Sequence, residues 1–560
     1  MTNYKILAAA KKAVQQDKIP KSWRILAEKF QDVSNVMDVP LSCGLLDEQE
    51  AKITSNYDAT ALLEKLKARV WSVEQVTVAF CKRAAIAHQL TNCLTEIFFD
   101  DAIERAKKLD LEYGQMSRDA LPPLFGLPIS LKDSFQVSGY DTSTGMGCYV
   151  HQPAEENSAL AAMLIDLGAV LYCKTNLPQT IMTGDTDNNI FGRTLNPRNK
   201  SLTAGGSTGG EGALIALRGS ILGFGTDIGG SIRVPAVCNG IYGFRPSVGL
   251  IPHDGVRDVT TPGTDGIRST AGPMATSLRD CSLLLKTVMQ ADTWKYDSTS
   301  ISIPWTDLRP VRKLRIGVAQ NDGVFTPSPP VRRALDQSVD LLRGNDSIEI
   351  IPITLPNVGL HYQDIMRYFA LLGNDYYYEQ FARTGEPAIP SLENIGLLSL
   401  PGTDLKGFFD LNVRRAEAAK NYLKLFRDNE IDVILMPPAP HTAVPLDTWV
   451  KAAYSSLWNY LDYPAIVVPT DHVRDTDSTD DLSNAQFGLE DKKLYSLYTG
   501  PEQYKDAPVG IMVVGYKHKD ESLLNAAAVL DSILNKQGYK HKDESLLNAA
   551  AVLDSILNKH

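Results

Sequence analysis

Two glycine-rich stretches of the chain carry serines whose hydroxyl groups could act as nucleophiles. Ser207 lies in "SLTAGGSTGGEGALIA" (201–216), and Ser231 follows 24 residues later in "GTDIGGSIRVP" (225–235). Eleven of the 36 residues from 205 to 240 are glycine, whereas an average usage of about 7% would give two or three. Clustered glycines mark tight turns whose N–H groups can converge on an anion. The segment therefore predicts a site for an anion or for an anionic transition state.

Three known uses of such a segment require neighbours that can be checked in the sequence. A phosphate-binding P-loop needs Lys and then Ser or Thr after its glycines, and a dinucleotide site needs GxGxxG; neither spacing is present. "GGSTG" (205–209) matches the GxSxG pattern of α/β-hydrolases, which follows an apolar strand and needs a later catalytic histidine. The preceding "LNPRNKSLTA" predicts no strand, and the later histidines lie in no recognisable motif. A serine nucleophile here needs a different base.

Lys132 is a candidate for that base, because it ends a stretch that predicts a buried strand. In "FGLPISLKDSF" (125–135), strand alternation places Leu127, Ile129 and Leu131 on one face and leaves the lysine on the other. Burial penalises the ammonium form and lowers a lysine pKa from about 10.4 by up to several units. A neutral amine at pH 7 could then accept a proton from a serine hydroxyl.

The stretches "GLPISLKD", "GGSTGGEGALIA" and "GTDIGGSIRVP" resemble, in order and spacing, the amidase signature enzymes, which hydrolyse amide bonds with a Ser–cis-Ser–Lys triad. Other segments, among them "FGRTLNPRNK" and "APVGIMVVG", are most similar to fungal acetamidases, so the resemblance covers nearly the whole chain. It implies the fold of that family, an α/β/α sandwich around a large mixed, mainly parallel sheet.

Carried over by position, the resemblance assigns the triad. Ser231 would be the nucleophile and Lys132 the base. Ser207 would be the bridging serine, preceded by a cis peptide bond that Gly206 makes sterically easier. Thr208 stands where the family often has a second serine, a departure that leaves the triad intact.

The "DIGGS" stretch would stabilise negative charge in the transition state. Consecutive backbone N–H groups can point at one oxygen and form an oxyanion hole, in which one donor is typically worth about 3 kcal/mol of barrier. Asp227 and Arg233 flank the stretch, and in the family they support this loop; an ordinary ion pair is an equally good interpretation. The expected donors are Ile228, Gly229, Gly230 and Ser231.

The motifs do not identify the residues that line the acyl pocket. "PQTIMTGDTDNN" (178–189) lies where the family often lines this pocket, which makes Ile181 and Met182 candidate walls, although either could equally belong to the core. The expected function is hydrolysis of a small, acetamide-like amide, or of a carbamate such as ethyl carbamate, through an acyl-enzyme without metal or organic cofactor. The alternatives are an amidotransferase A subunit, which acts on charged tRNA with partner subunits, and a non-catalytic scaffold on the same fold.

The elements that must position these residues alternate between short apolar strands and helices. This alternation predicts an α/β fold with a largely parallel sheet covered on both faces. Three later apolar stretches need a sheet to join, and we expect them to complete the first one. They are "IDVILMPPAP", "YPAIVVP" and "APVGIMVVG".

Polarity, periodicity and an exact repeat divide the chain into three parts. Residues 1–55 are polar and weakly periodic and predict a helical N-terminal arm, followed by a single catalytic domain at 56–536. The 22-residue sequence at 515–536 recurs without change at 538–559. Two copies are too few for a solenoid, which needs three or more. We therefore predict that 537–560 is a linker and a surplus copy of a C-terminal helix.

Composition narrows the class of protein. Hydrophobic residues make up 44% of the chain and charged residues 22%, as in ordinary soluble proteins. A net charge of −10 argues against nucleic acid or an anionic membrane as the main partner. Seven cysteines without a CxxC pair predict reduced thiols in an intracellular protein. With no secretory or peroxisomal signal visible, the expected location is the cytoplasm. A homo-oligomer is left open.

Overall fold

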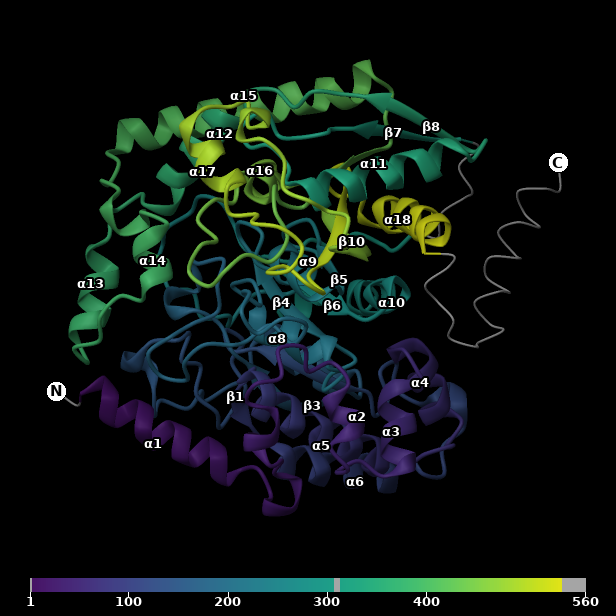
Figure 1. Ribbon diagram of the computed structural model, residues 1–560. Helices are drawn as coiled ribbons and strands as arrows, with labels where there is room; N and C mark the ends of the chain where they lie inside the picture. The colour runs from purple at the N-terminus through teal and green to yellow at the C-terminus, as the bar shows by residue number, and fades with distance from the viewer. Residues whose placement is uncertain (1–2, 307–312, 536–560) are drawn as a thin grey trace.

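The computed structural model describes residues 3–306 and 313–535, and its strands in those ranges join into one sheet (Figure 1). The strands are β1 (Leu94–Ile97), β2 (Pro128–Lys132), β3 (Val170–Thr175), β4 (Leu222–Asp227), β5 (Tyr242–Arg245), β6 (Thr270–Ala275), β7 (Leu314–Val318), β8 (Ile348–Pro352), β9 (Val433–Met436), β10 (Ala465–His472) and β11 (Pro508–Val514). Their order across the sheet is β1-β3-β2-β4-β6-β5-β10-β11-β9-β7-β8.

Helices cover the sheet, and their ends follow local sequence signals. At the start of the fifth helix, the Ser72 hydroxyl accepts the Gln75 N–H at 3.0 Å and the Gln75 side chain accepts the Ser72 N–H at 3.0 Å, a capping box. The helices are α1 (Tyr4–Asp17), α2 (Val39–Ser42), α3 (Glu48–Ser55), α4 (Ala59–Lys67), α5 (Val73–Thr91), α6 (Phe99–Tyr113), α7 (Ala159–Asp166), α8 (Gly209–Ala216), α9 (Arg233–Asn239), α10 (Leu278–Met289), α11 (Pro329–Arg343), α12 (Val358–Phe369), α13 (Asp375–Ala382), α14 (Pro390–Asn394), α15 (Leu405–Asp428), α16 (Ala453–Leu461), α17 (Leu489–Tyr495) and α18 (Asp520–Leu534).

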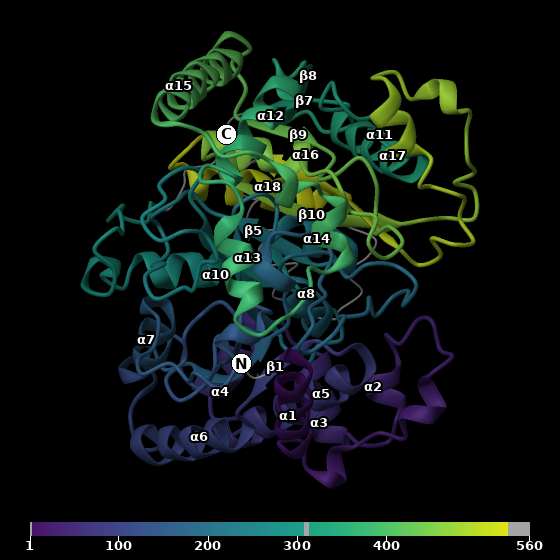
Figure 2. The same ribbon diagram turned by 90° about the vertical axis from the view of Figure 1, so that its left-hand side faces the viewer.

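Alternate residues of a central strand reach two different cores. In β11, Ile511 and Val513 pack into the cluster that contains α5, α10 and α18, whereas Met512 and Val514 pack into the cluster formed by α12, α15 and α16. Because side chains alternate across a strand, these clusters lie on opposite faces of the sheet. In the turned view, α15 lies at one end of the molecule and α1, α3 and α6 at the other (Figure 2). The predicted α/β sandwich is confirmed.

The sheet is mixed, as the sequence predicts, but less parallel than expected. Among the described strands, four pairings are parallel and six are antiparallel. β4, α9 and β5 form a crossover unit, and β6 fills the gap between the two strands by pairing antiparallel with both. Local alternation of strands and helices predicts crossovers, but it does not show which later strand fills the gap between them.

The first copy of the repeated sequence forms α18, which packs on the sheet beside α10 and α11. Leu523, Ala527 and Leu530 are fully buried and Leu534 is partly buried, as their helical spacing predicts. The second copy, at 538–559, lies outside the described residues. Its surplus status therefore stays a prediction, as does the division of the chain into arm and catalytic domain.

Two properties of the described residues bear on the class of protein. No helix within them is long and apolar enough to cross a membrane. All seven cysteines are free thiols, and six of them are buried. The six buried thiols therefore act as small core side chains in this fold.

Candidate active site

Lys132 is the last residue of β2, on the side of the sheet where the neighbouring strand β4 also ends. The two strands run parallel, with Leu131 opposite Phe224, so their carboxyl ends meet at one edge. Lys132 is 0% exposed. Its Nζ donates to Ser207 Oγ at 2.7 Å and to Thr226 Oγ1 at 2.9 Å. β2 thus places a buried lysine in contact with Ser207 of the first glycine-rich segment.

The environment of Lys132 favours its neutral form. Burial lowers the pKa of the ammonium group to about 7, although the negative charges of Asp227 and Asp258 act in the opposite direction. A large share of the lysine is therefore unprotonated near neutral pH. An amine so placed can accept the proton of a hydroxyl group at hydrogen-bond distance, which Ser207 supplies.

Ser207 lies just before α8 and is fully buried. The peptide bond between Gly206 and Ser207 is cis, as the family resemblance implies. A Cβ on Gly206 would lie 2.4 Å from the carbonyl oxygen of Thr183 and 2.9 Å from the Asp185 nitrogen. Backbone surrounds this position, so only glycine fits before the serine.

Ser231 lies in the loop that joins β4 to α9. It is partly exposed, and together with Gly206 it lines a cavity. The structure therefore joins two of the three expected triad residues, Lys132 and Ser207, by a hydrogen bond, and it places the third on the wall of a cavity that a substrate could enter.

Asp227 holds the backbone of this loop. Its carboxylate oxygens accept the N–H of Gly230 at 2.8 Å and the N–H of Ile232 at 3.1 Å. The Gly230 N–H, one of the expected oxyanion-hole donors, is therefore hydrogen-bonded to Asp227 in this structure. The physical reason is that an aspartate at a strand end can reach back to N–H groups a few residues on. The other expected donors are Ile228, Gly229 and Ser231.

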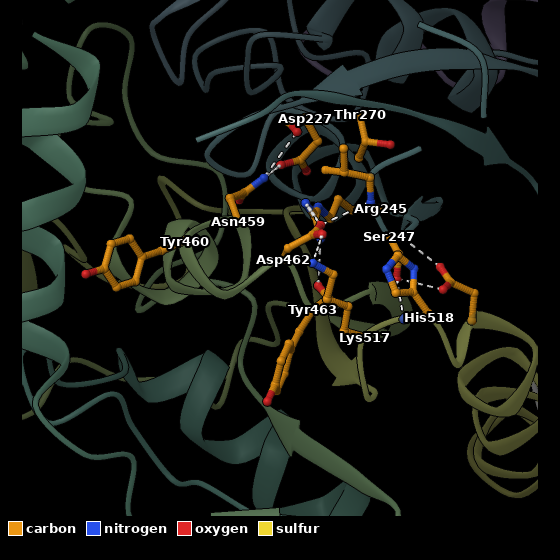
Figure 3. Close-up of polar contacts among 12 residues, drawn as sticks. Asp227, Arg245, Ser247, Thr270, Asn459, Tyr460, Asp462, Tyr463, Lys517 and His518 are labelled. Atoms are coloured by element: carbon orange, nitrogen blue, oxygen red, sulfur yellow. Dashed lines mark hydrogen bonds and ion pairs between the residues drawn. The ribbon is translucent and has the colours of Figure 1, made fainter. Parts of the chain in front are cut away.

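Asp227 is itself fixed by two side chains. Arg233 donates to both carboxylate oxygens, at 2.9 and 3.0 Å. The Asn459 amide of α16 donates to the same carboxylate at 2.8 Å (Figure 3). Burial would raise the pKa of the Asp227 carboxyl, but the Arg233 guanidinium and these hydrogen bonds hold it well below its usual range. At the end of α16, Asp462 pairs with Arg245 at 2.8 Å. The Asn459 amide thus ties the Asp227 loop to α16, and the buried Arg245–Asp462 pair ties β5 to the end of the same helix.

A cavity opens at the Ser231 loop. Ile181 and Met182, the two candidate acyl-pocket residues, both line it. Most of its other walls are apolar and come from segments far apart in the chain. They are Ile228, Val234, Tyr362, Met366, Phe369, Ile395, Leu397, Trp449, Val450 and Ala452, and the polar side chains in the lining are Thr183, Ser231, Lys451 and Ser456.

Sequence patterns missed the walls that α12 and the segment before α16 contribute. A Cβ on Gly229 would lie 3.5 Å from the Phe369 ring, and a Cβ on Gly184 would lie 2.3 Å from the Trp449 indole. Glycine at 184 is thus a local signal of close approach, whereas the contact at 229 is an ordinary van der Waals one. Nothing in the local sequence indicates which aromatic side chain approaches.

The site contains no histidine among its lining residues. Within residues 3–306 and 313–535, no three or more His, Cys, Asp or Glu side chains are grouped as a metal site would require. The chemistry available at the cavity is that of hydroxyl groups, backbone N–H groups and the partly exposed Lys451, with the buried Lys132 behind it on Ser207.

Comparison with known proteins identifies the family. The family model described as Amidase matches residues 75–524. The chain belongs to the amidase family. Acetamidase from Emericella nidulans is 37% identical, with 94% of this chain and 98% of that protein covered. Amidase from Gibberella moniliformis is 38% identical, with 95% and 99% covered. The solved structure of a fatty acid amide hydrolase is 31% identical, covers 94% of each chain and has a TM-score of 0.87. The chain is therefore an amidase, as its motifs predict.

Proposed function

We propose that this amidase hydrolyses small amides through an acyl-enzyme on Ser231. The observation that carries the proposal is the 2.7 Å contact between Ser207 and a buried lysine with a pKa of about 7, beside the cavity that Ser231 lines. The printed name of the relative from Emericella nidulans, acetamidase, supports a small acyl group. The expected amidotransferase alternative has no structural observation in its favour.

In the proposed mechanism, the Ser231 hydroxyl attacks the amide carbonyl while its proton passes to Ser207, whose own proton passes to Lys132. The N–H groups of Ile228, Gly229 and Ser231 would stabilise the oxyanion. Collapse of the tetrahedral intermediate breaks the C–N bond, and the amine leaves with the proton returned through Ser207. Water then cleaves the ester by the same route, which restores the Ser231 hydroxyl and releases the acid.

The side chains that line the cavity indicate which acyl groups the enzyme would accept. Its apolar walls, including Ile181, Met182 and Phe369, suit an apolar acyl group. Carbamate esters present the same carbonyl oxygen to the loop and carry a better leaving group than an amide. We therefore include ethyl carbamate among the proposed substrates.

The test is turnover by the purified, isolated chain. Acetamide, longer aliphatic amides, an aromatic amide and ethyl carbamate are compared, with Ser231→Ala as the control. We expect turnover by the wild type, its loss in Ser231→Ala, and fluorophosphonate labelling confined to Ser231. Failure of the isolated chain on every amide would favour a subunit that needs partners. A label found on Ser207 would overturn the assignment of the nucleophile.

A further inference from the structure

We propose that Ser455 of α16 is a positioning residue for the oxyanion-hole backbone; this rests on the proposed attack by Ser231. The Ser455 side chain is 1% exposed. Its Oγ donates to the carbonyl oxygen of Gly229 at 2.7 Å and, at 3.2 Å, to that of Ala452 in its own helix. One buried hydroxyl group thus connects a helix to the loop that carries the nucleophile.

The peptide group between Gly229 and Gly230 is held at both ends. Ser455 binds its carbonyl oxygen, and Asp227 Oδ1 accepts its N–H at 2.8 Å. Because a peptide group is planar, contacts at both ends fix its orientation. The two neighbouring N–H groups, those of Gly229 and Ser231, belong to the peptide groups on either side. Rotation of the held peptide would therefore turn both of these proposed donors.

The rest of the loop is held by backbone hydrogen bonds, one within the loop and one from the segment before α8. The Gly230 carbonyl accepts the Val234 N–H at 2.7 Å, and the Ser231 carbonyl accepts the Thr208 N–H at 3.2 Å. The Gly229 carbonyl differs, because its partner is a side chain from a distant helix. That contact is also close: a Cβ on Gly230 would lie 2.3 Å from Ser455 Oγ.

The position of Ser455 on α16 supports this role. Asn459, which donates to Asp227, lies four residues later and therefore on the same face of the helix. The Ser455 carbonyl also accepts Arg233 Nη1 at 2.8 Å. One face of α16 thus contacts the carboxylate, the guanidinium and the peptide group that shape the loop.

The test compares Ser455→Ala with Ser338→Ala. Ser338 is also buried and donates from Oγ to a carbonyl oxygen, that of Ala334 in α11, at 2.7 Å. Both variants lose one buried hydroxyl group, so similar losses of thermal stability are expected. Removal of one oxyanion donor costs about 100- to 1000-fold in rate. Ser455→Ala leaves the donors in place but less well oriented, so we expect a smaller loss, about 10- to 100-fold in kcat with little change in KM. Ser338→Ala should show no such loss.

A second readout separates positioning from general damage to the fold. An aldehyde that carries the acyl group of the best substrate forms a tetrahedral oxyanion with Ser231. Its affinity should therefore fall together with kcat in Ser455→Ala and stay unchanged in Ser338→Ala. Ser455→Cys, whose thiol is a weaker donor, should lie between wild type and Ser455→Ala, and it carries the test if the alanine variant does not fold. Equal kcat and equal aldehyde affinity in the two alanine variants would overturn the inference. Full activity of Ser231→Ala would instead overturn the proposed function.

Discussion

The two sides of the cavity are built in different ways. On the loop side, the backbone from Asp227 to Val234 is fixed by hydrogen bonds and by the buried Asp227–Arg233 ion pair. On the other side, apolar side chains such as Met366, Phe369 and Leu397 line the cavity. Polar groups that act on a transition state must be held in place before the reaction. An apolar wall need only exclude water and set the shape of the space.

This difference separates two kinds of effect. Changes on the loop side should reduce the rate for every substrate or destabilise the fold, because each polar group there has a specific partner. Changes on the apolar side should alter which substrates fit while leaving the chemistry intact. The predictions below test this separation, from the largest expected effect to the smallest.

Lys132→Arg should cause the largest loss. Arginine keeps the positive charge but cannot lose its proton in a protein, and general-base catalysis typically contributes about 100- to 10,000-fold. We expect a loss in that range for all amides. In the wild type, activity requires neutral Lys132, whose pKa is about 7, so kcat/KM should rise with pH through about 7 and fall as the amine protonates below it. A variant that keeps more than a tenth of the wild-type rate would place the base elsewhere.

Asp227→Ala should destabilise the protein. It leaves Arg233 buried without its carboxylate, and breaking a buried pair costs about 3–5 kcal/mol. Urea denaturation should show this loss in the free energy of unfolding. Asp340→Ala, which removes the exposed partner of Arg343, is the control and should change little. Equal stability of the two variants would show that the buried network does not fix the loop.

Phe369→Ala should change selectivity more than rate. Its ring lies against the Gly229 position, so the variant enlarges the cavity beside the loop. We expect longer acyl groups to gain over acetamide in kcat/KM by about 10- to 200-fold, the range that pocket size usually commands. Phe409→Ala on α15, where the side chain is 56% exposed, is the control. A uniform loss of kcat/KM for all substrates would contradict the proposed difference between the two sides of the cavity.

Deletion of residues 538–560 should have the smallest effect. The contacts of α18 with the sheet are made by the first copy, through Leu523, Ala527 and Leu530, and the deletion leaves them in place. Calorimetry and light scattering should show an unchanged melting temperature and mass, with unchanged turnover. A melting temperature lower by several degrees, or a new oligomer mass, would refute the prediction that the second copy is surplus.

The sequence alone determined the local features of this site. The buried strand that ends at Lys132, the glycines around Ser207 and Ser231 and the start of α5 at Ser72 follow from strand alternation, glycine's conformational freedom and helix capping. Each of these depends on residues close together in the chain, so a pattern can reveal it. The same patterns, with the resemblance they carry, led to the amidase family.

Only the tertiary structure decided what depends on distant segments. It showed that Asp227 uses the Gly230 N–H, that antiparallel β6 lies between β4 and β5, and that Phe369 and Ser455 approach the loop. The contacts of Phe369 and Ser455 join residues more than a hundred positions apart, and the place of β6 depends on how strands pair across the sheet. Such contacts arise from packing of whole elements, in which many apolar side chains would serve equally well, so no local pattern specifies them.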